Sequence, residues 1–544
     1  MNASLLRWCA GLLLACMCSL AGCSDGGLFG EPVKLSLIAG SESKQIEEIL
    51  RECARKSGVE LDVHYGGSVE MMLSMRRADF AFDAVMPASS IWLRLGDRDH
   101  HRVREESSIM RSPVALGVKH AIAHSLGWIG RDVTVADILD AVRKGRLNFA
   151  MTSATQSNSG FASYIGMLSA LAGRPEVLTV EHLEQPELKE KIKSLLGGVN
   201  RGSGSSGWLM ESFLKDHARL DAMFNYESMI IAANQRLVQE GAPPLFIIYP
   251  VDGLAVADCT LGFVNRPGLP DNQKKKDAFI RWRNCLLTDA IQTRILQTGF
   301  RTGLIGMNPA GAPAGVFNPA WGIDLGRTIS PVPWPDAAVT LQALTLYQTA
   351  FRKPSLTAFA LDCSGSMNSG GLDQLKNALR LLFDPATASE YFIQTGAEDI
   401  TVVIPFHRGL VWEKPLVVKG NSRQELEALV RRIESLTADG NTDIYNPVSA
   451  AWDTFASLGP GIRRYLPSVI LMTDGQSNAG SLEWLLSRWT KKAAGFEMPP
   501  VFCIMYGEAS DDQLQRLARA TSGRVFDGRK DGLEKAFREA KGYN

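Results

Sequence analysis

The sequence predicts an α/β protein with two domains, and three observations support this fold class. The chain has 544 residues, 45% of them apolar and 21% charged, which rules out a single small domain. Segments typical of strands and of helices alternate between residues 33 and 303. Two later segments, 356–361 and 468–472, are almost entirely apolar, as expected for strands buried on both faces of a parallel sheet.

The charge balance excludes one class of partner. The chain contains 58 Lys and Arg residues and 58 Asp and Glu residues, so its formal net charge is zero. A protein that binds nucleic acid neutralises backbone phosphates with an excess of basic residues. We therefore expect no nucleic-acid partner.

Residues 1–22 have the three parts of a secretory signal peptide: Arg7, a short apolar stretch and then small residues. The sequence Leu-Ala-Gly-Cys ending at Cys23 resembles the lipobox of bacterial lipoproteins. The resemblance implies cleavage before Cys23, lipidation of that residue, and a lipid-anchored envelope protein facing the periplasm. Ser24, in place of an aspartate, favours the outer membrane over the inner membrane. The alternative is an ordinary cleaved signal in which Cys23 is incidental.

Small polar residues follow the predicted strands of the first domain and open the next helices. Residues 40–43, 66–68 and 152–160 are such segments. Free backbone N–H groups at helix starts suit an anion or another polar ligand. Each segment alone is also explained by helix capping, in which a hydroxyl satisfies its own helix end. Several such segments in one domain favour a shared ligand cleft.

Residues 33–303 resemble an extracellular solute-binding protein of the two-lobed periplasmic type. The resemblance is carried by residues 40–43, by the run ending at Gly160, and by segments 225–229, 248–254 and 260–264. It implies a ligand held between two lobes. The ligand-binding candidates are Ser41, Ser68, Ser89, Ser157, Ser159 and Tyr226.

Residues 304–353 form the predicted joint between the domains. Repeated Pro, Gly and Ala residues between about 305 and 335 disfavour regular structure. Residues 336–351 are then expected to form one amphipathic helix that leads into the second domain, residues 354–544.

Oxygen-bearing side chains follow the predicted strands of the second domain. The strand 356–361 is followed by Asp362, Ser364 and Ser366, and the strand 468–472 by Asp474; Thr442 lies in a loop between them. Ligands of open α/β sheets collect at the carboxyl ends of the strands. Hydroxyls together with a pair of aspartates suit a small hard cation, which prefers oxygen ligands.

This set resembles the metal-ion-dependent adhesion site of a von Willebrand factor A domain, a Rossmann-like fold. The resemblance implies a divalent cation, Mg²⁺ first and Mn²⁺ or Ca²⁺ as alternatives, whose shell is completed by a carboxylate from a protein partner. The metal candidates are Asp362, Ser364, Ser366, Thr442 and Asp474. The alternative is a group of ordinary turn and cap residues.

Five cysteines follow Cys23, and their spacing fits no zinc site. An oxidising periplasm permits a bridge between Cys259 and Cys285; two buried thiols are the alternative. Cys363, next to Asp362, is expected to be a packed thiol, because nothing nearby in the sequence would lower its pKa.

The sequence thus predicts a lipid-anchored envelope protein that binds a protein partner through a divalent cation, with a solute-binding-like domain of unnamed ligand. The alternative function is a receptor that delivers a small solute or oxyanion to a transport system, with the A domain as a docking arm. The motifs of common hydrolases and nucleotide-binding enzymes are missing from the sequence, so we expect no enzyme and name no catalytic residue.

Overall fold

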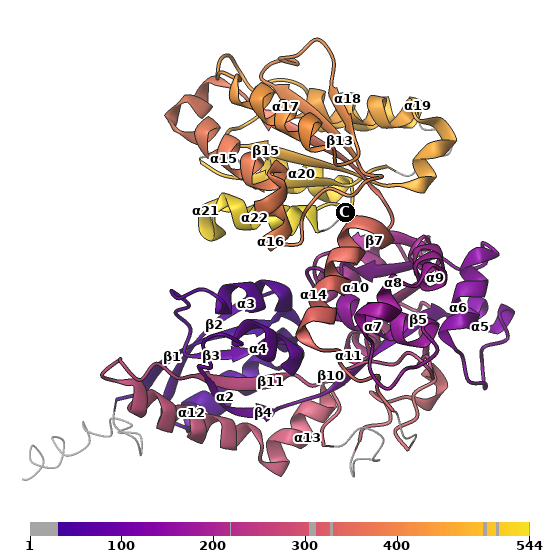
Figure 1. The fold of residues 1–544 in the computed structure, drawn as a ribbon, viewed down its shortest axis with the longest axis vertical. Helices are drawn as coiled ribbons and strands as arrows, with labels where there is room; N and C mark the ends of the chain where they lie inside the picture. The colour runs from indigo at the N-terminus through magenta and orange to yellow at the C-terminus, as the bar shows by residue number, and fades with distance from the viewer. Residues whose placement is uncertain are drawn as a thin grey trace, which may run out of the picture.

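The structure is a computed structural model that describes residues 31–217, 219–303, 312–326, 330–492, 498–507 and 511–542. The predicted signal peptide and Cys23 lie outside these ranges. Three sheets, each flanked by helices, confirm the α/β class and the two-lobed first domain (Figure 1). Within the described ranges, no helix has the length and apolar character needed to cross a membrane.

Lobe 1 is built on a five-stranded sheet in the order β2-β1-β3-β11-β4. Strands β1 and β2 and strands β1 and β3 are parallel, whereas β11 runs antiparallel to both of its neighbours. The strands are β1 (Val33–Gly40), β2 (Val59–Gly66), β3 (Ala84–Met86), β4 (Val103–Ser108) and β11 (Thr260–Val264). The helices are α2 (Glu47–Lys56), α3 (Ser68–Met75), α4 (Ser90–Gly96), α12 (Asn272–Leu286) and α13 (Asp289–Gln297), with the short 3-10 helix η1 (Ser41–Ile46) after β1.

Lobe 2 is built on a second sheet in the order β10-β5-β8-β6-β7, with β9 also paired to β5. Its strands are β5 (Ser112–Lys119), β6 (Phe149–Thr152), β7 (Val199–Ser203), β8 (Ala222–Tyr226), β9 (Leu245–Ile248) and β10 (Val256–Ala257). Its helices are α5 (His120–Ser125), α6 (Val135–Arg143), α7 (Asn158–Leu171), α8 (Val180–Glu184), α9 (Pro186–Leu196), α10 (Ser206–Lys215) and α11 (Glu227–Gln239). The chain passes between the lobes three times: from β4 to β5, from β10 to β11, and after α13, where Arg301 pairs with Glu227 of lobe 2. Short crossovers of this kind are where a hinge motion between two lobes takes place.

The disulfide pairing differs from the predicted one. Cys285 on α12 is bonded to Cys53 on α2, with a Cα–Cα distance of 5.7 Å, and Cys259 is a free buried thiol. The predicted Cys259–Cys285 bridge is therefore wrong. Cys285 lies on a helix that packs against α2, and this contact joins segments 232 residues apart in the chain.

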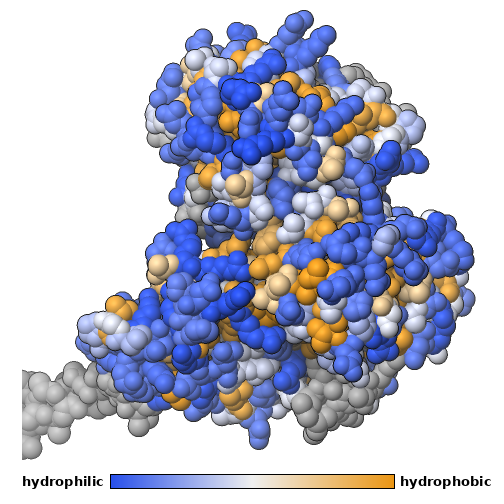
Figure 2. All heavy atoms as spheres, viewed as in Figure 1, coloured by the Kyte–Doolittle hydropathy of each residue, from blue (hydrophilic) through white to orange (hydrophobic). Residues whose placement is uncertain are grey.

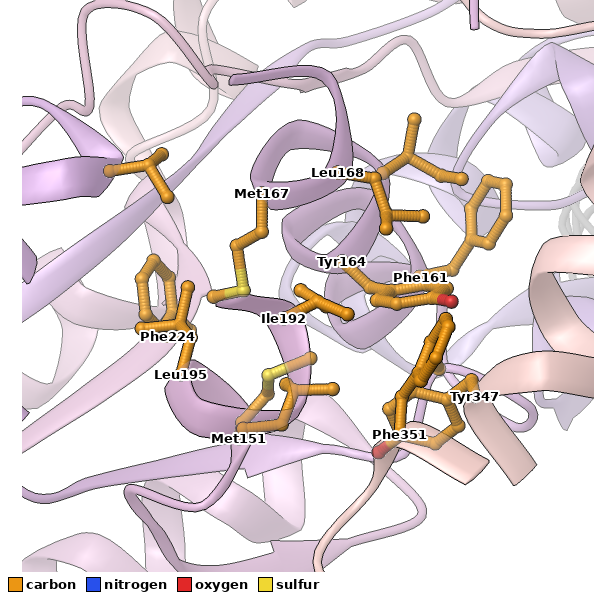
Figure 3. Close-up of a cluster of buried hydrophobic side chains, with 14 of the residues drawn as sticks. Met151, Phe161, Tyr164, Met167, Leu168, Ile192, Leu195, Phe224, Tyr347 and Phe351 are labelled. Carbon is orange, nitrogen blue, oxygen red and sulfur yellow. The ribbon is translucent and has the colours of Figure 1, made fainter. Parts of the chain in front are cut away.

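The joint packs tightly against lobe 2. Helix α14 (Ala337–Leu346) continues into a π-helical turn (Tyr347–Phe351), which matches the predicted helix over 336–351 apart from this change of winding. Trp334 stacks on Phe161, and the Tyr164 hydroxyl donates to the Ala343 carbonyl at 3.0 Å. Figure 3 shows Tyr347 and Phe351 facing α7 in the buried cluster. The joint therefore fixes the next domain to lobe 2.

The C-terminal domain, residues 355–542, has a six-stranded sheet in the order β14-β13-β12-β15-β16-β17, parallel except for β14. Alternate residues of β12 enter two cores: Phe359 and Leu361 pack on one face, and Leu356, Ala358 and Ala360 on the other. This confirms the strand buried on both faces. The strands are β12 (Ser355–Asp362), β13 (Ile400–Phe406), β14 (Leu416–Lys419), β15 (Leu466–Thr473), β16 (Val501–Met505) and β17 (Val525–Asp527). The helices are α15 (Gly371–Phe383), α16 (Pro385–Glu390), α17 (Arg423–Glu434), α18 (Tyr445–Ala456), α19 (Leu482–Lys492), α20 (Asp511–Ala520), α21 (Gly528–Asp531) and α22 (Leu533–Lys541).

The amino edge of the C-terminal sheet faces lobe 2. Strand β15 lies against β7, and Leu466, its first residue, packs on the lobe 2 core together with Phe392. At about 3.3 Å per residue, the eight residues of β12 and of β15 place the carboxyl edge of the sheet about 25 Å farther away. The C-terminal domain thus packs on lobe 2 through the amino edge of its sheet (Figure 1). The carboxyl edge of this sheet is remote from both lobes.

Candidate functional site

The three segments predicted to hold a metal ion meet at the carboxyl edge of the C-terminal sheet. Strand β12 ends at Asp362, and its parallel neighbour β15 ends at Thr473. Leu361 lies opposite Met472 in the ladder, so the next residues, Asp362 and Thr473, are also adjacent. The loops that carry Ser364 and Asp474 therefore start side by side.

Hydrogen bonds connect four of the five predicted metal ligands. The Ser364 backbone N–H donates to Asp362 Oδ1 at 2.8 Å. The hydroxyl oxygens of Ser364 and Ser366 lie 3.2 Å apart, and the Ser366 hydroxyl donates to Asp474 Oδ1 at 2.8 Å. These bonds place two carboxylates and two hydroxyls around one region of the sheet edge.

Thr442, the fifth predicted ligand, reaches the same region from a third loop. The Gly365 N–H donates to the Gly440 carbonyl at 2.9 Å, which ties the two loops together. A Cβ built on Gly475 would lie 3.4 Å from the Ser366 hydroxyl oxygen and 3.6 Å from that of Thr442. Because Gly475 has no side chain, the space bordered by both hydroxyls stays open. The three loops that carry the five predicted residues therefore meet at one region of the sheet edge, which we call the candidate metal site.

The two carboxylates of the candidate metal site are buried without a basic partner. Asp362 is fully buried and Asp474 is 8% exposed. Burial raises the pKa of both carboxyl groups, and the neighbouring Asp474 charge raises the pKa of Asp362 further. Among the described residues, no lysine or arginine forms an ion pair with either carboxylate. Buried carboxylates are costly unless a cation or hydrogen-bond donors compensate them, so this oxygen set fits a divalent metal ion.

Thr473 and Cys363 flank the candidate metal site. The Thr473 hydroxyl donates to Asp362 Oδ2 at 2.5 Å and so orients that carboxylate. Sequence reasoning missed this residue, although it directly precedes Asp474. Cys363 is a free buried thiol whose pKa is raised to about 12 by desolvation, which confirms its predicted packing role.

A second candidate site is a cavity between the lobes. It has a volume of about 160 Å³. Of the six predicted ligand-binding residues, Ser41, Ser68 and Ser157 line the cavity. The remaining three, Ser89, Ser159 and Tyr226, are buried and do not line it. The structure therefore brings three of the predicted residues to the cavity and sets three apart from it.

The lobes are closed onto each other around this cavity. The Ser41 hydroxyl of lobe 1 lies 3.3 Å from the Ser205 hydroxyl of lobe 2. The Trp92 indole N–H donates to Asn158 Oδ1 at 2.7 Å across the same boundary. Sequence reasoning missed Ser205 and Asn158 as separate candidates, although Asn158 lies in the small polar segment 152–160 that it singled out.

Ser159 and Tyr226 support the cavity wall from behind. The Ser159 hydroxyl lies 2.7 Å from that of Ser206, and Ser206 in turn lies 3.1 Å from the hydroxyl of Ser157. The Tyr226 hydroxyl accepts a hydrogen bond from Asn158 Nδ2 at 3.1 Å. These two predicted residues therefore position residues of the wall.

Glu42 is an unpredicted acidic residue in the wall of the cavity. Its side chain is 4% exposed, and Oε1 has no hydrogen-bond partner among the described residues. Desolvation raises the pKa of Glu42 to about 7. Its position between Ser41 and Ser43, within the singled-out segment 40–43, could have indicated it, but only the hydroxyl residues of that segment were considered.

Glu42→Gln should reduce the pH dependence of stability. Because the pKa of Glu42 is raised from 4.5 to about 7, the folded protein binds this proton more tightly than the unfolded chain does. The resulting stability is present below the unfolded pKa and is lost as the pH rises towards 7. We expect the wild-type free energy of unfolding to fall between about pH 5 and about pH 8 by up to about 3 kcal/mol more than that of E42Q. Denaturant unfolding of both proteins at the two pH values measures this, and equal pH dependence would contradict the assignment.

Comparison with protein families gives one match for each domain. Residues 36–301 match the family model of bacterial extracellular solute-binding proteins, and residues 358–538 match that of von Willebrand factor type A domains. No curated protein matches the chain.

Solved structures similar to this chain include relatives of both domains. A von Willebrand factor type A protein from Catenulispora acidiphila is 19% identical, with a TM-score of 0.28; the match covers 36% of this chain and 43% of that one. Iron-bound HitA from Pseudomonas aeruginosa is 14% identical, with a TM-score of 0.41 and coverage of 58% and 99%. A ferric binding protein from Campylobacter jejuni is 15% identical, with a TM-score of 0.40 and coverage of 57% and 98%.

The first match also bears on location, because its family consists of extracellular proteins of bacteria. It indicates a place in the bacterial envelope or periplasm. The family matches agree with the sheets described above, which divide between the two lobes and the C-terminal domain. The chain therefore joins a bacterial extracellular solute-binding domain to a von Willebrand factor type A domain.

Proposed function

We propose that this chain is an envelope protein that binds a protein partner through a divalent cation in its C-terminal domain. The observation that carries the proposal is the pair of buried carboxylates, Asp362 and Asp474, with hydroxyls and no basic partner around them. Mg²⁺ is the first candidate, since it prefers oxygen ligands and keeps several waters. Mn²⁺ and Ca²⁺ are the alternatives.

The chemistry of such an ion suits adhesion. Asp362, Ser364, Ser366, Thr442 and Asp474 would hold it, and only two of these five side chains carry charge. A cation with few charged ligands attracts a carboxylate from another protein. We therefore propose a partner that offers an exposed Asp or Glu, and we assign the ion a binding role and no catalytic one.

The position of the site favours access by a large partner. The amino edge of the sheet packs on lobe 2 through Leu466, whereas Asp362 and Asp474 lie at the opposite edge. The lobes therefore do not cover the candidate metal site. Lipidation at Cys23 is part of the proposal: it would tether the chain to the outer membrane and present this edge to the periplasm.

Replacing two metal ligands should abolish cation-dependent capture. Asp362→Ala with Ser364→Ala removes one carboxylate and one hydroxyl, and we expect Mg²⁺-dependent recovery of the partner from envelope extract to fall at least about tenfold. The matched control is Asp439→Asn, an exposed acidic residue in the neighbouring loop. Pull-downs with and without chelator measure the effect, and equal recovery by the wild type in both would contradict the proposal.

A second candidate function is that of a receptor for a small solute or oxyanion. The cavity between the closed lobes supports it, because Ser41, Ser157 and Ser205 offer hydroxyl donors there. In this case the C-terminal domain serves as a docking arm for a transport system.

A solute that binds the cavity should raise the melting temperature of the full chain, because only the folded state binds it. The probes are phosphate, sulfate, single amino acids and simple sugars. Ser41→Ala with Ser157→Ala should remove the shift, whereas the control Ser125→Ala, on the exposed surface of lobe 2, should keep it. A shift that survives loss of both cavity serines would rule out this cavity as the site.

A further inference from the structure

The cavity between the lobes has a third wall, which comes from the C-terminal domain. Its lobe 1 side includes Ser41 and Ser68, and its lobe 2 side includes Ser157 and Ser205. The residues contributed by the C-terminal domain are Tyr391, Ile393, Arg524, Lys535, Arg538 and Glu539. Three of these six, Lys535, Arg538 and Glu539, belong to α22, so this last helix of the described chain forms part of the cavity wall. The space-filling view shows the C-terminal domain resting against both lobes at this level (Figure 2).

Gln156 is the point where all three bodies meet. Its side-chain Nε2 donates to the Arg538 carbonyl of α22 at 2.6 Å. Its own carbonyl oxygen would lie 2.6 Å from a Cβ on Gly67 of lobe 1. A Cβ on Gly542, just after α22, would lie within 2 Å of the Gln156 side chain. Glycine at both positions therefore permits the close approach of lobe 1, lobe 2 and α22.

The C-terminal domain is held to lobe 2 by contacts away from the cavity. The Lys215 ammonium donates to the Arg519 carbonyl at 2.5 Å, and the Trp208 and Phe502 rings lie 6.2 Å apart. Lys193 also pairs with Glu398. Together with the packed joint, these contacts hold the C-terminal domain against lobe 2.

Lobe 1 meets the same domain through a charge pair. Glu70 on α3 and Lys535 on α22 are 3.4 Å apart, and both are about a quarter exposed. Opening of the lobes at the crossovers between them would carry lobe 1 away from α22 and break this pair. Lobe 1 therefore contacts α22 when the cleft is closed and loses this contact when the cleft opens.

We propose that α22 is a lid on the cleft, and that molecules reach the cavity only when lobe 1 and the C-terminal domain separate. The lid proposal rests on the walls of the cavity and on the contacts of α22. It requires neither a bound cation nor a named solute, and so it is independent of the proposed function.

A cysteine placed in the cavity reports access to it. Ser205→Cys introduces a thiol in the wall, and its reaction with N-ethylmaleimide is followed peptide by peptide with mass spectrometry in the full chain. The native thiols of Cys259, Cys363 and Cys503 are buried, so their slow labelling shows that each variant stays folded.

Reversing the charge on the lid should speed labelling. Lys535→Glu replaces an attraction to Glu70 by a repulsion, and we expect the reporter to react about two- to fivefold faster. Glu70→Lys combined with Lys535→Glu restores opposite charges and should return the rate to that of the reporter alone.

Locking the lid should have the opposite effect. Carbodiimide joins the Glu70 carboxylate to the Lys535 amine as an amide with loss of water, and we expect labelling of the locked protein to slow at least about tenfold. Lys535→Arg keeps the charge but forms no such amide, so it controls for coupling elsewhere. Equal labelling rates in the reversed, locked and parent proteins would overturn the lid proposal, as would equal slowing in the Lys535→Arg control.

Discussion

Two carboxylates held at the end of a buried sheet are the constraint on which the functional account depends. Asp362 and Asp474 sit where β12 and β15 end, and only hydroxyl and amide groups donate to them within the described chain. Burial raises the pKa of both groups, which measures how poorly the protein alone stabilises their charge. A cation in the space beside Gly475 would supply the missing positive charge.

The second constraint is the packed joint, which fixes the C-terminal domain against lobe 2 of the first domain. Tyr347 and Phe351 enter the buried cluster around α7, and Trp334 packs against the same cluster and against that of lobe 1, so the C-terminal domain cannot rotate freely as it would on a flexible linker. Its two ends therefore have different surroundings. The carboxyl edge with Asp362 and Asp474 is remote from the lobes, whereas α22 lies over the cleft.

The parts of the fold and of the site that could be predicted from the sequence are those that depend on short, contiguous sequence patterns. The apolar strand 356–361 followed by Asp362, Ser364 and Ser366 is readable because the strand and its loop are contiguous. The Cys53–Cys285 bridge was missed, because it depends on how α2 packs against α12 across 232 residues. Glu42 was missed because its burial depends on how segments far apart in the chain pack around the cavity that it lines. Ser89, Ser159 and Tyr226 were expected at the cavity because the resemblance to solute-binding proteins implied a ligand between the lobes. Which of them faces the cavity depends on the relative placement of the lobes.

The most direct test of the central claim is the position of a bound ion. Crystals of the full chain grown with Mn²⁺ should show one anomalous-difference peak bordered by oxygens of Ser364, Ser366, Thr442 and the two aspartates, at about 2.0–2.6 Å from its nearest ligands. The Asp362→Ala protein should show no peak there under the same conditions. An empty site in the wild type at saturating Mn²⁺, with the two carboxylates still buried, would contradict the account.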